Sequence, residues 1–223
     1  MKKNEIAYGN CIDLMEEIST DFVDLTLTDI PYDMVNRADN GLRNLNKGNA
    51  DIKTFDLNIF LEKVYRITKG TIIIFCGVNQ VSTIYSFFAE KQSKKLGTTR
   101  QLIWQKNNPM PMNGQHIYLS GIENAIWFKK KSGIFNAHCK NTVFKYPIGS
   151  SRLHPTEKNH GLLKELILDN SNIGSLVFDP CSGSGSHYLI AKQNNRDFMG
   201  CELDENFYKI SQERIKSISN TLF

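Results

Sequence analysis

The chain has 223 residues, of which 40% are hydrophobic and 22% are charged, a balance that is ordinary for a globular domain with a sizeable core. No run of about eighteen apolar residues occurs and no apolar run follows Lys2 and Lys3, so we expect neither a membrane span nor a signal peptide. The five cysteines include no close pair, which favours reduced thiols in a cytoplasm over a disulfide framework or a zinc site.

The positive charge is concentrated in one part of the chain. Residues 91–152 contain eleven lysines and arginines but a single acid, Glu123, so this segment carries +10. Because the whole chain carries +4, the remainder carries −6. This asymmetry predicts a surface that faces a polyanion such as nucleic acid, although a solvated lysine-rich face would give the same composition.

Strands and helices are predicted to alternate through the first half of the chain. The spacing of apolar residues predicts strands over 4–8, 22–28, 71–76 and 100–105, and helices over 11–18, 57–68 and 81–92. Gly70 is expected to end the second of these helices. Residues 33–53 are polar and rich in asparagine and glycine, which predicts a long loop that serves as a lid or binding segment.

The second half continues this alternation. A loop rich in proline and amides, 107–116, precedes a strand over 122–129, and residues 130–152 are basic and irregular. Thr156 is expected to cap a helix that Gly174 closes. Strands follow over 175–179 and 197–201, with helices from 186 to about 194 and from about 205 to 218. The pattern predicts an α/β domain with a largely parallel sheet.

Polar side chains follow four of the predicted strands, at Asn10, Asp29, Asp179 and Glu202. Because ligands of parallel sheets bind beyond the carboxyl ends of the strands, we expect these groups to share one edge. In the tetrapeptide Asp29-Ile30-Pro31-Tyr32, a carboxylate, a proline that stops the strand and an aromatic ring stand at a rigid strand tip. Taken alone, the tetrapeptide is better explained as an ordinary turn.

Residues 178–185 combine a strand end, a glycine-bearing turn and a helix start. Gly183 and Gly185 let the backbone approach a ligand closely, and Glu202, about twenty residues later, is placed to accept from ribose hydroxyls. No Gly-Lys-Ser/Thr sequence follows, which excludes a Walker loop. Asp179 would repel a pyrophosphate and favour a sulfonium group, which points to S-adenosylmethionine. The alternative is a tight turn with Glu202 as a surface acid.

Three motifs together resemble the β class of DNA amino-methyltransferases, in which the catalytic motif precedes the cofactor motif. They are Asp29-Ile30-Pro31-Tyr32, then His154-Pro155-Thr156-Glu157-Lys158, then 179–185 with Glu202. The resemblance covers nearly the whole chain and implies one methyltransferase domain over 1–223, with 106–152 as a small basic target-recognition insertion. It implies a Rossmann-like, S-adenosylmethionine-dependent methyltransferase sheet in circularly permuted order, with strand 175–179 beside strand 23–28.

The resemblance also implies a role for each motif. Asp29 and the Ile30 carbonyl would accept the two N–H bonds of an exocyclic amine, Pro31 would fix the turn, and Tyr32 would stack on a base flipped out of the duplex. The cofactor-binding residues that it implies are Asn10, Cys11, Asp29, His154, Pro155, Thr156, Lys158, Asp179, Cys181, Gly183, Gly185 and Glu202. The DNA-binding residues that we expect are Asn36, Arg37, Lys47, Asn113, Gln115, His116 and Arg152, and Lys129–Lys131 suit phosphates. The chemistry requires no metal.

Three positions depart from the pattern of the family. Ile30 stands where proline is usual, Asn10 where aspartate is commoner, and Asn159 where proline is usual. The change at Ile30 adds a backbone N–H to the catalytic motif. It leaves the alternative that the protein is catalytically degenerate and only binds DNA or the cofactor.

Asp29 favours the N6 of adenine over the N4 of cytosine, where serine is commoner, so we expect an adenine-specific DNA methyltransferase. Methylation of cytosine N4 and methylation of RNA are the alternatives. The expected partner is double-stranded DNA rather than a membrane, and the expected location is the cytoplasm of a bacterial or phage-infected cell. The sequence does not reveal whether the protein forms a homodimer or acts with a restriction enzyme.

Overall fold

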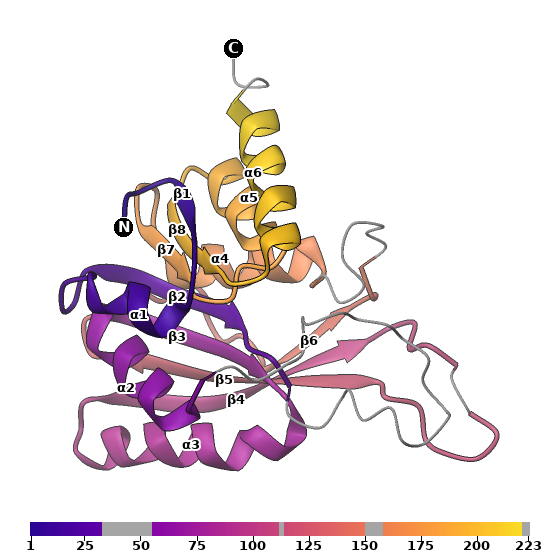
Figure 1. Cartoon of the computed structure of the whole chain (residues 1–223). Helices are drawn as coiled ribbons and strands as arrows, with labels where there is room; N and C mark the ends of the chain where they lie inside the picture. The colour runs from indigo at the N-terminus through magenta and orange to yellow at the C-terminus, as the bar shows by residue number, and fades with distance from the viewer. Residues whose placement is uncertain (33–54, 112–113, 150–157, 220–223) are drawn as a thin grey trace.

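The computed structural model describes residues 1–32, 55–111, 114–149 and 158–219. Its strands are β1 (Glu5–Tyr8), β2 (Val23–Asp29), β3 (Thr68–Cys76), β4 (Gly97–Lys106), β5 (Ile122–Lys130), β6 (Val143–Tyr146), β7 (Leu176–Asp179) and β8 (Asp197–Glu202). Within the described ranges, these strands form one sheet in the order β1-β8-β7-β2-β3-β5-β4-β6 (Figure 1). All neighbouring strands are parallel except in the β3–β5 and β4–β5 pairs.

Helices cover both faces of the sheet (Figure 1). They are α1 (Cys11–Glu16), α2 (Leu57–Ile67), α3 (Val78–Ser93), α4 (His160–Asn170), α5 (Ser186–Gln193) and α6 (Glu205–Ser219). The first three contribute to one hydrophobic core, and α4 and α5 to a second core on the opposite face, against which α6 packs. The molecule is therefore a three-layer α/β/α structure, which confirms the predicted α/β class.

The central strands are apolar on both faces because each face is covered. In β3, Ile72 and Ile74 point into the first core, whereas Ile73 and Phe75 point into the second. All four side chains are buried. This is the near-continuous apolar run that a parallel sheet between two helical layers requires.

The strand order brings distant segments of the chain to one edge. Strand β7 lies beside β2, with Leu25 opposite Val177 and Thr26 opposite Phe178. Strand β8 follows β7, and β1 follows β8. The predicted neighbours are confirmed, and the residues that follow β1, β2, β7 and β8 meet at the carboxyl edge of the sheet, which we call the catalytic edge.

The prediction that residues 130–152 are irregular was wrong for β6. Val143–Tyr146 pairs in parallel with the end of β4, with Ile103 opposite Val143. The strand has four residues, and only Phe144 in it is buried. A strand so short and so exposed carries almost no period-two signal, which explains why the sequence did not reveal it.

The sequence predicted that Gly70 ends a helix. The structure shows that it lies inside β3. Helix α2 ends at Ile67 and β3 begins at the next residue. Opposite β2 the pairing slips, because Val23 pairs with Thr68 and Leu25 with Thr71, so that a bulge forms at Gly70. A Cβ atom at Gly70 would lie 2.0 Å from the Asp24 carbonyl oxygen. The glycine is needed for this close backbone approach.

Helix α4 begins later than predicted. Its first residue is His160, and the side chain of Asn159 accepts a hydrogen bond from the Leu162 N–H at 3.1 Å. The expected cap, Thr156, lies outside the described residues. The unusual Asn159 is therefore a good N-cap, because its side-chain oxygen satisfies an N–H that the helix leaves unpaired.

The five cysteines are free in the structure. Across the described ranges, no helix combines the length and apolar character that crossing a bilayer requires. The same residues contain no cluster of three or more histidine, cysteine, aspartate or glutamate side chains suited to a metal ion.

The bulge at Gly70 gives a prediction about stability. We expect Gly70→Ala to lower the free energy of unfolding by about 1–3 kcal/mol, because the new methyl group collides with the backbone of β2. Gly121→Ala is the matched control, since the nearest atom to its added Cβ is 3.9 Å away. Urea denaturation measures both, and equal midpoints for the two variants would contradict the assignment.

Candidate active site

Asp29 stands at the carboxyl end of β2, between the ends of β3 and β7. One carboxylate oxygen, Oδ2, accepts a hydrogen bond from the Lys158 ammonium at 2.5 Å. The other oxygen, Oδ1, is buried and has no hydrogen-bond partner among the described residues. A buried carboxylate oxygen without a donor is rare, and it marks a place where a ligand N–H can bind.

Lys158 stands two residues before the start of α4 and is 5% exposed. Besides Asp29, its ammonium contacts a Glu123 carboxylate oxygen at 2.9 Å and donates to the Tyr32 hydroxyl at 3.2 Å. The sequence predicted Lys158 among the cofactor-binding residues, near the methionine end. The structure shows its side chain against the catalytic tetrapeptide, and its expected contact with the cofactor stays a prediction.

Glu123 is a site residue that the sequence did not reveal. It is the second residue of β5, and its other carboxylate oxygen lies 2.9 Å from the ammonium of Lys106, the last residue of β4. The Tyr32 hydroxyl donates to Glu123 at 3.3 Å. Its isolation as the single acid of the basic segment was the available signal, because a lone acid among so many cations is rarely without a partner.

The charges of this cluster explain its pKa shifts. Burial raises the pKa of Asp29, Lys158 lowers it and Glu123 raises it, so that the net shift is upward. Burial also raises the pKa of Glu123, but Lys158 and Lys106 outweigh burial and lower that pKa to about 2. Burial alone would lower the pKa of Lys158, yet the two carboxylates raise it. Lys158 and Glu123 are therefore both ionised at neutral pH.

The backbone of the tetrapeptide is held from β3 and α3. The Ile30 N–H, which the usual proline would lack, donates to the Phe75 carbonyl at 3.2 Å. The Pro31 carbonyl accepts from the side-chain amide of Gln80 at 2.9 Å, and the amide oxygen of Gln80 accepts from Gly77 N–H at 2.9 Å. Gln80 is buried and was not predicted as a site residue. The extra N–H at Ile30 thus extends the sheet rather than disturbing the site.

Tyr32 packs against the end of β3. A Cβ atom at Gly77 would lie 3.2 Å from the Tyr32 Cβ, so a larger residue there would press on the Tyr32 side chain. The Lys158 ammonium is 5.3 Å from the centroid of the ring. Burial, Asp29 and Glu123 raise the pKa of Tyr32 well above its usual range, so the phenol is neutral. Its expected stacking on a base stays a prediction.

The turn after β7 has the backbone conformation that its glycines predicted. Gly183 and Gly185 have φ values of 50° and 81°, in the left-handed region. Asp179 is fully buried, its Oδ1 accepts from the Cys181 N–H at 3.0 Å, and its Oδ2 lies 2.8 Å from His187 Nδ1. The structure therefore shows Asp179 ordering the turn, and its expected contact with a cofactor stays a prediction.

Glu202 closes this turn from β8. Its two carboxylate oxygens accept from the Gly183 N–H at 2.6 Å and from the Asp204 N–H at 2.7 Å, while its carbonyl accepts from the Gly9 N–H at 2.9 Å. Burial is the main cause of the raised pKa of Glu202. A carboxylate of this kind, with lone pairs to spare beside a glycine turn, suits the hydroxyls of a ribose.

The turn after β1 supplies the remaining described residues of the predicted cofactor site. Asn10 caps α1, because its side-chain oxygen accepts from the Ile12 N–H at 2.9 Å. Cys11 is buried, and its thiol interacts with that of Cys181 in the turn after β7. The predicted residues Asn10, Cys11, Cys181, Gly183, Gly185 and Glu202 are thus brought together. Their polar backbone, small side chains and single ribose-suited acid fit a nucleoside cofactor.

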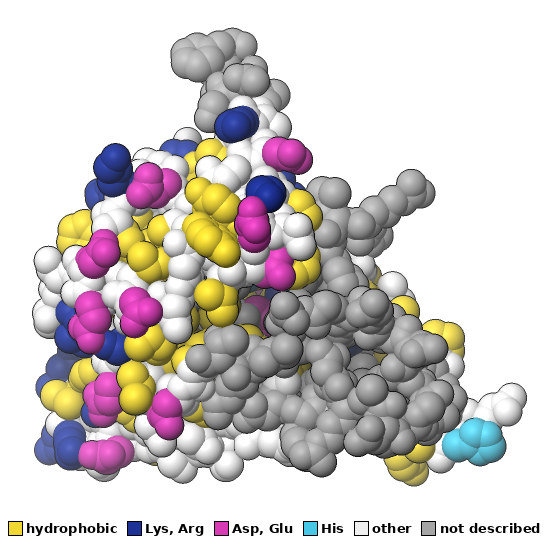
Figure 2. Space-filling view, in the orientation of Figure 1, with side chains coloured by type: hydrophobic (Ala, Val, Ile, Leu, Met, Phe, Trp, Pro, Cys, Tyr) yellow, Lys and Arg dark blue, Asp and Glu magenta, His cyan; other side chains and the backbone are white. Residues whose placement is uncertain are grey.

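The predicted DNA-binding residues are only partly described. Asn36, Arg37, Lys47, Asn113 and Arg152 lie outside the described residues, as do His154, Pro155 and Thr156 of the predicted cofactor set. Gln115 and His116 are exposed on the hairpin between β4 and β5, which projects beyond the catalytic edge (Figure 1). On the face shown in Figure 2, basic and acidic side chains are interspersed over the part of the surface that the structure describes.

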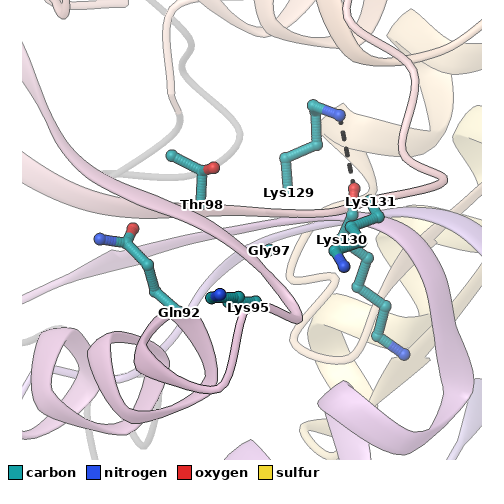
Figure 3. Close-up of a pocket in the computed structure, with 7 residues that line it drawn as sticks. All are labelled: Gln92, Lys95, Gly97, Thr98, Lys129, Lys130 and Lys131. Atoms are coloured by element: carbon teal, nitrogen blue, oxygen red, sulfur yellow. Dashed lines mark hydrogen bonds between the residues drawn. The ribbon is translucent and has the colours of Figure 1, made fainter.

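Lys129–Lys131 lie at the opposite edge of the sheet from Asp29, because β5 begins at the catalytic edge and runs away from it. They line a hollow of about 450 Å³ (Figure 3). Lys129 donates to the Gly133 carbonyl at 2.9 Å, and Lys130 pairs with Asp21 at 2.8 Å. The hollow is lined by Gln92, Lys95, Gly97, Thr98, Lys129, Lys130 and Lys131. These lysines therefore do not flank the predicted catalytic residues.

Comparison with known proteins agrees with this fold. The family model N6_N4_Mtase, described as DNA methylase, matches residues 23–213. The type II methyltransferase M2.MboI of Moraxella bovis is 27% identical over 250 aligned positions, which cover 99% of this chain and 90% of that protein. The chain belongs to the DNA methylase family of N6 and N4 amino-methyltransferases.

Solved structures support the fold. The crystal structure of the M1.HpyAVI–SAM complex has a TM-score of 0.71 and 23% identity, covering 94% of this chain and 98% of that one. The cytosine-N4-specific PvuII DNA methyltransferase also has a TM-score of 0.71, at 15% identity, covering 96% of this chain and 89% of that one. The fold is the Rossmann-like methyltransferase fold in permuted order, as the sequence predicted.

The environment of Ile30 gives a prediction about the departure from the family pattern. We expect Ile30→Pro to lower the free energy of unfolding by about 2–4 kcal/mol, because it removes the hydrogen bond to Phe75 and shrinks a side chain that is 2% exposed. Ile30→Val keeps the N–H and should cost only about 0.5–1.5 kcal/mol. Thermal and urea unfolding measure both, and an Ile30→Pro variant as stable as the natural chain would show that Ile30 is not integral to this core.

Proposed function

We propose that this protein transfers a methyl group from S-adenosylmethionine to the exocyclic N6 of adenine within a short site in double-stranded DNA. The observation that carries the proposal is the buried Oδ1 atom of Asp29, which has no donor among the described residues and stands at the catalytic edge. An exocyclic amine supplies the N–H that this oxygen lacks. Membership of the DNA methylase family supports the same reaction.

The chain's own groups act on the amine mainly by positioning and electrostatics. Asp29 Oδ1 and the Ile30 carbonyl accept its two N–H bonds, which favours a pyramidal nitrogen with its lone pair free to react. When bound, S-adenosylmethionine supplies a methyl group on a cationic sulfur, which departs with the electron pair of the broken bond. The nitrogen gains the methyl group and loses one proton, and Asp29 Oδ1 is placed to accept that proton. Tyr32 stacks on the flipped base.

The proposed cofactor-binding residues contact different parts of S-adenosylmethionine. Glu202 accepts from the ribose, Gly183 and Gly185 let the backbone approach, and Asn10 and Cys11 border the adenine ring. Asp179 contributes negative charge and orders the turn. His154, Pro155 and Thr156 complete the cofactor site on the grounds of family resemblance. On the DNA side we propose Asn36, Arg37, Lys47, Asn113, Gln115, His116 and Arg152.

Adenine is proposed over cytosine because an aspartate opens the catalytic motif. A neutral hydroxyl is the commoner residue in enzymes that methylate cytosine N4, whereas a carboxylate accepts more strongly from the amine of adenine. The fold does not separate the two, since the PvuII enzyme is cytosine-N4-specific and has a similar structure. Methylation of cytosine N4 is therefore the second candidate.

Nucleoside analysis tests the proposal directly. The protein is incubated with labelled S-adenosylmethionine and unmethylated DNA, and the digested nucleosides are identified by mass spectrometry. We expect N6-methyldeoxyadenosine. N4-methyldeoxycytidine would favour the second candidate, and label found in RNA but not in DNA would overturn the proposed substrate.

Replacement of Asp29 separates catalysis from cofactor binding. We expect Asp29→Ala to lower the rate of methyl transfer by about 100-fold or more, since it removes an acceptor aimed at the reacting amine. The dissociation constant for S-adenosylmethionine, measured by calorimetry, should change by less than about 3-fold. Asp29→Asn is the matched variant, because it keeps the shape and removes the charge. Joint loss of transfer and cofactor binding would show that Asp29 serves the cofactor instead.

A further inference from the structure

Four side chains of alternating charge connect the root of the β4–β5 hairpin to the catalytic carboxylate. Lys106 is 2.9 Å from Glu123, Glu123 is 2.9 Å from Lys158, and Lys158 is 2.5 Å from Asp29. The side chain of Lys158 is 4% exposed, and those of Glu123 and Lys106 are 19% and 14% exposed. The four residues come from four separate places in the chain, and their formal charges sum to zero.

Stability alone is a poor explanation for such a chain of charges. Removing ions from water costs several kcal/mol for each ion, and apolar residues of similar size often serve a core equally well. Every link, however, leads towards Asp29 Oδ1, a buried carboxylate oxygen that has no hydrogen-bond donor among the described residues. Lys158 holds the other oxygen of the same carboxylate, so it fixes the direction in which Oδ1 points.

We propose that Glu123, itself anchored by Lys106, is a positioning residue that shares Lys158 with Asp29, so that Lys158 orients Asp29 without neutralising it. The inference rests on the proposed function, because it assigns Asp29 Oδ1 to the target amine. With Glu123 present, the ammonium of Lys158 divides its hydrogen bonds between two carboxylates. Without Glu123, that ammonium would turn fully to Asp29, and the carboxylate would accept an amine hydrogen more weakly.

The groups that face Asp29 determine the sign of the effect on pH dependence. They are Lys158 ahead of α4, Glu123 on β5, Tyr32 after β2 and Cys76 at the end of β3. The Tyr32 phenol is neutral, and burial raises the pKa of the Cys76 thiol to about 12, so it is neutral as well. Glu123 is thus the negative charge that raises the pKa of Asp29, and its removal lowers that pKa.

The test is the variant Glu123→Gln, which keeps the size of the side chain and removes its charge. Methyl transfer requires ionised Asp29, so activity falls as pH drops through the pKa of that carboxyl group. We expect kcat to fall by about 10-fold, with KM for S-adenosylmethionine changed by less than about 3-fold. The acid limb of the kcat–pH profile should move to lower pH by about half a unit or more. An unmoved limb, or one displaced to higher pH, would overturn the proposal.

Three further variants separate positioning from folding. Glu123→Asp keeps the charge, so its acid limb should return to the natural position even where kcat recovers only in part. Glu90→Gln is the matched control, because it removes an acid that pairs with Lys94 on the exposed side of α3, and it should leave both kcat and the limb unchanged. If Glu123→Gln does not fold, Lys106→Met tests the outer link, with an expected 3-fold or greater loss of kcat at unchanged KM. No loss would overturn the proposal.

A titration of the ligand-free protein makes the inference independent of the reaction. Carbon-13 NMR of the side-chain carboxyl group of Asp29, assigned by its absence in Asp29→Asn, reports the pKa directly. We expect the titration to move to lower pH in Glu123→Gln, and an unchanged titration would overturn the role of Glu123. If the unmutated protein methylates no adenine, the proposed function is overturned. The titration of Asp29 would still test the role of Glu123.

Discussion

The pairing of β7 with β2 is the constraint on which the site depends. Only two pairs of residues define this register, Leu25 with Val177 and Thr26 with Phe178, yet they join segments that lie 150 residues apart in the chain. Both strands run in the same direction, so the turn after Asp179 and the tetrapeptide that begins at Asp29 emerge side by side. A slip of one residue would turn every side chain of β2 to the opposite core. The buried Leu25 and Leu27 oppose such a slip, because both belong to the second core.

The main features of the fold could be predicted because they are periodic. The buried apolar runs and the polar residues at the strand ends predicted a largely parallel sheet with a shared edge, and the resemblance to the methyltransferase family implied its permuted order. The features that were missed lack that periodicity. Gly70 was interpreted as the end of a helix because glycine commonly has that role, whereas its reason is a contact with Asp24 in another strand. Strand β6 exists only because the end of β4 offers it a partner.

The site could be predicted as far as its motifs extend. Asp29, Glu202 and the glycines were predicted because each stands where the chain changes from strand to turn. Glu123 and Gln80 could not be assigned, because their roles follow from the antiparallel return of β5 and from the first turn of α3. Lys158 was found in its motif, but its contacts with Asp29 and Glu123 were not predicted. A motif states which residues are present, and only the fold states which groups they contact.

The tetrapeptide shows how a departure from a family pattern can be absorbed by the sheet. A proline at position 30 would offer no N–H, whereas Ile30 uses its own to add one hydrogen bond to β3 and its side chain to fill the core beside Cys76. The carbonyl on the far side of the motif, that of Pro31, is held by Gln80. Two hydrogen bonds on consecutive residues therefore fix the backbone between Asp29 and Tyr32, so the rigidity that proline usually supplies comes here from β3 and α3.

The basic charge of residues 91–152 is divided by the same sheet. Strands β4 and β5 are antiparallel, so Lys106 stands at the catalytic edge and Lys129–Lys131 stand at the other. Between Lys106 and Lys129 the sequence contains neither lysine nor arginine, and the hairpin carries exposed Met110, Ile117 and Tyr118 instead. Lysine and arginine neutralise phosphates and also read guanine, whereas amide and apolar side chains can contact base edges without adding charge. The composition predicted one basic surface, but the fold places Lys129–Lys131 away from the catalytic edge and leaves the hairpin at that edge poor in cations.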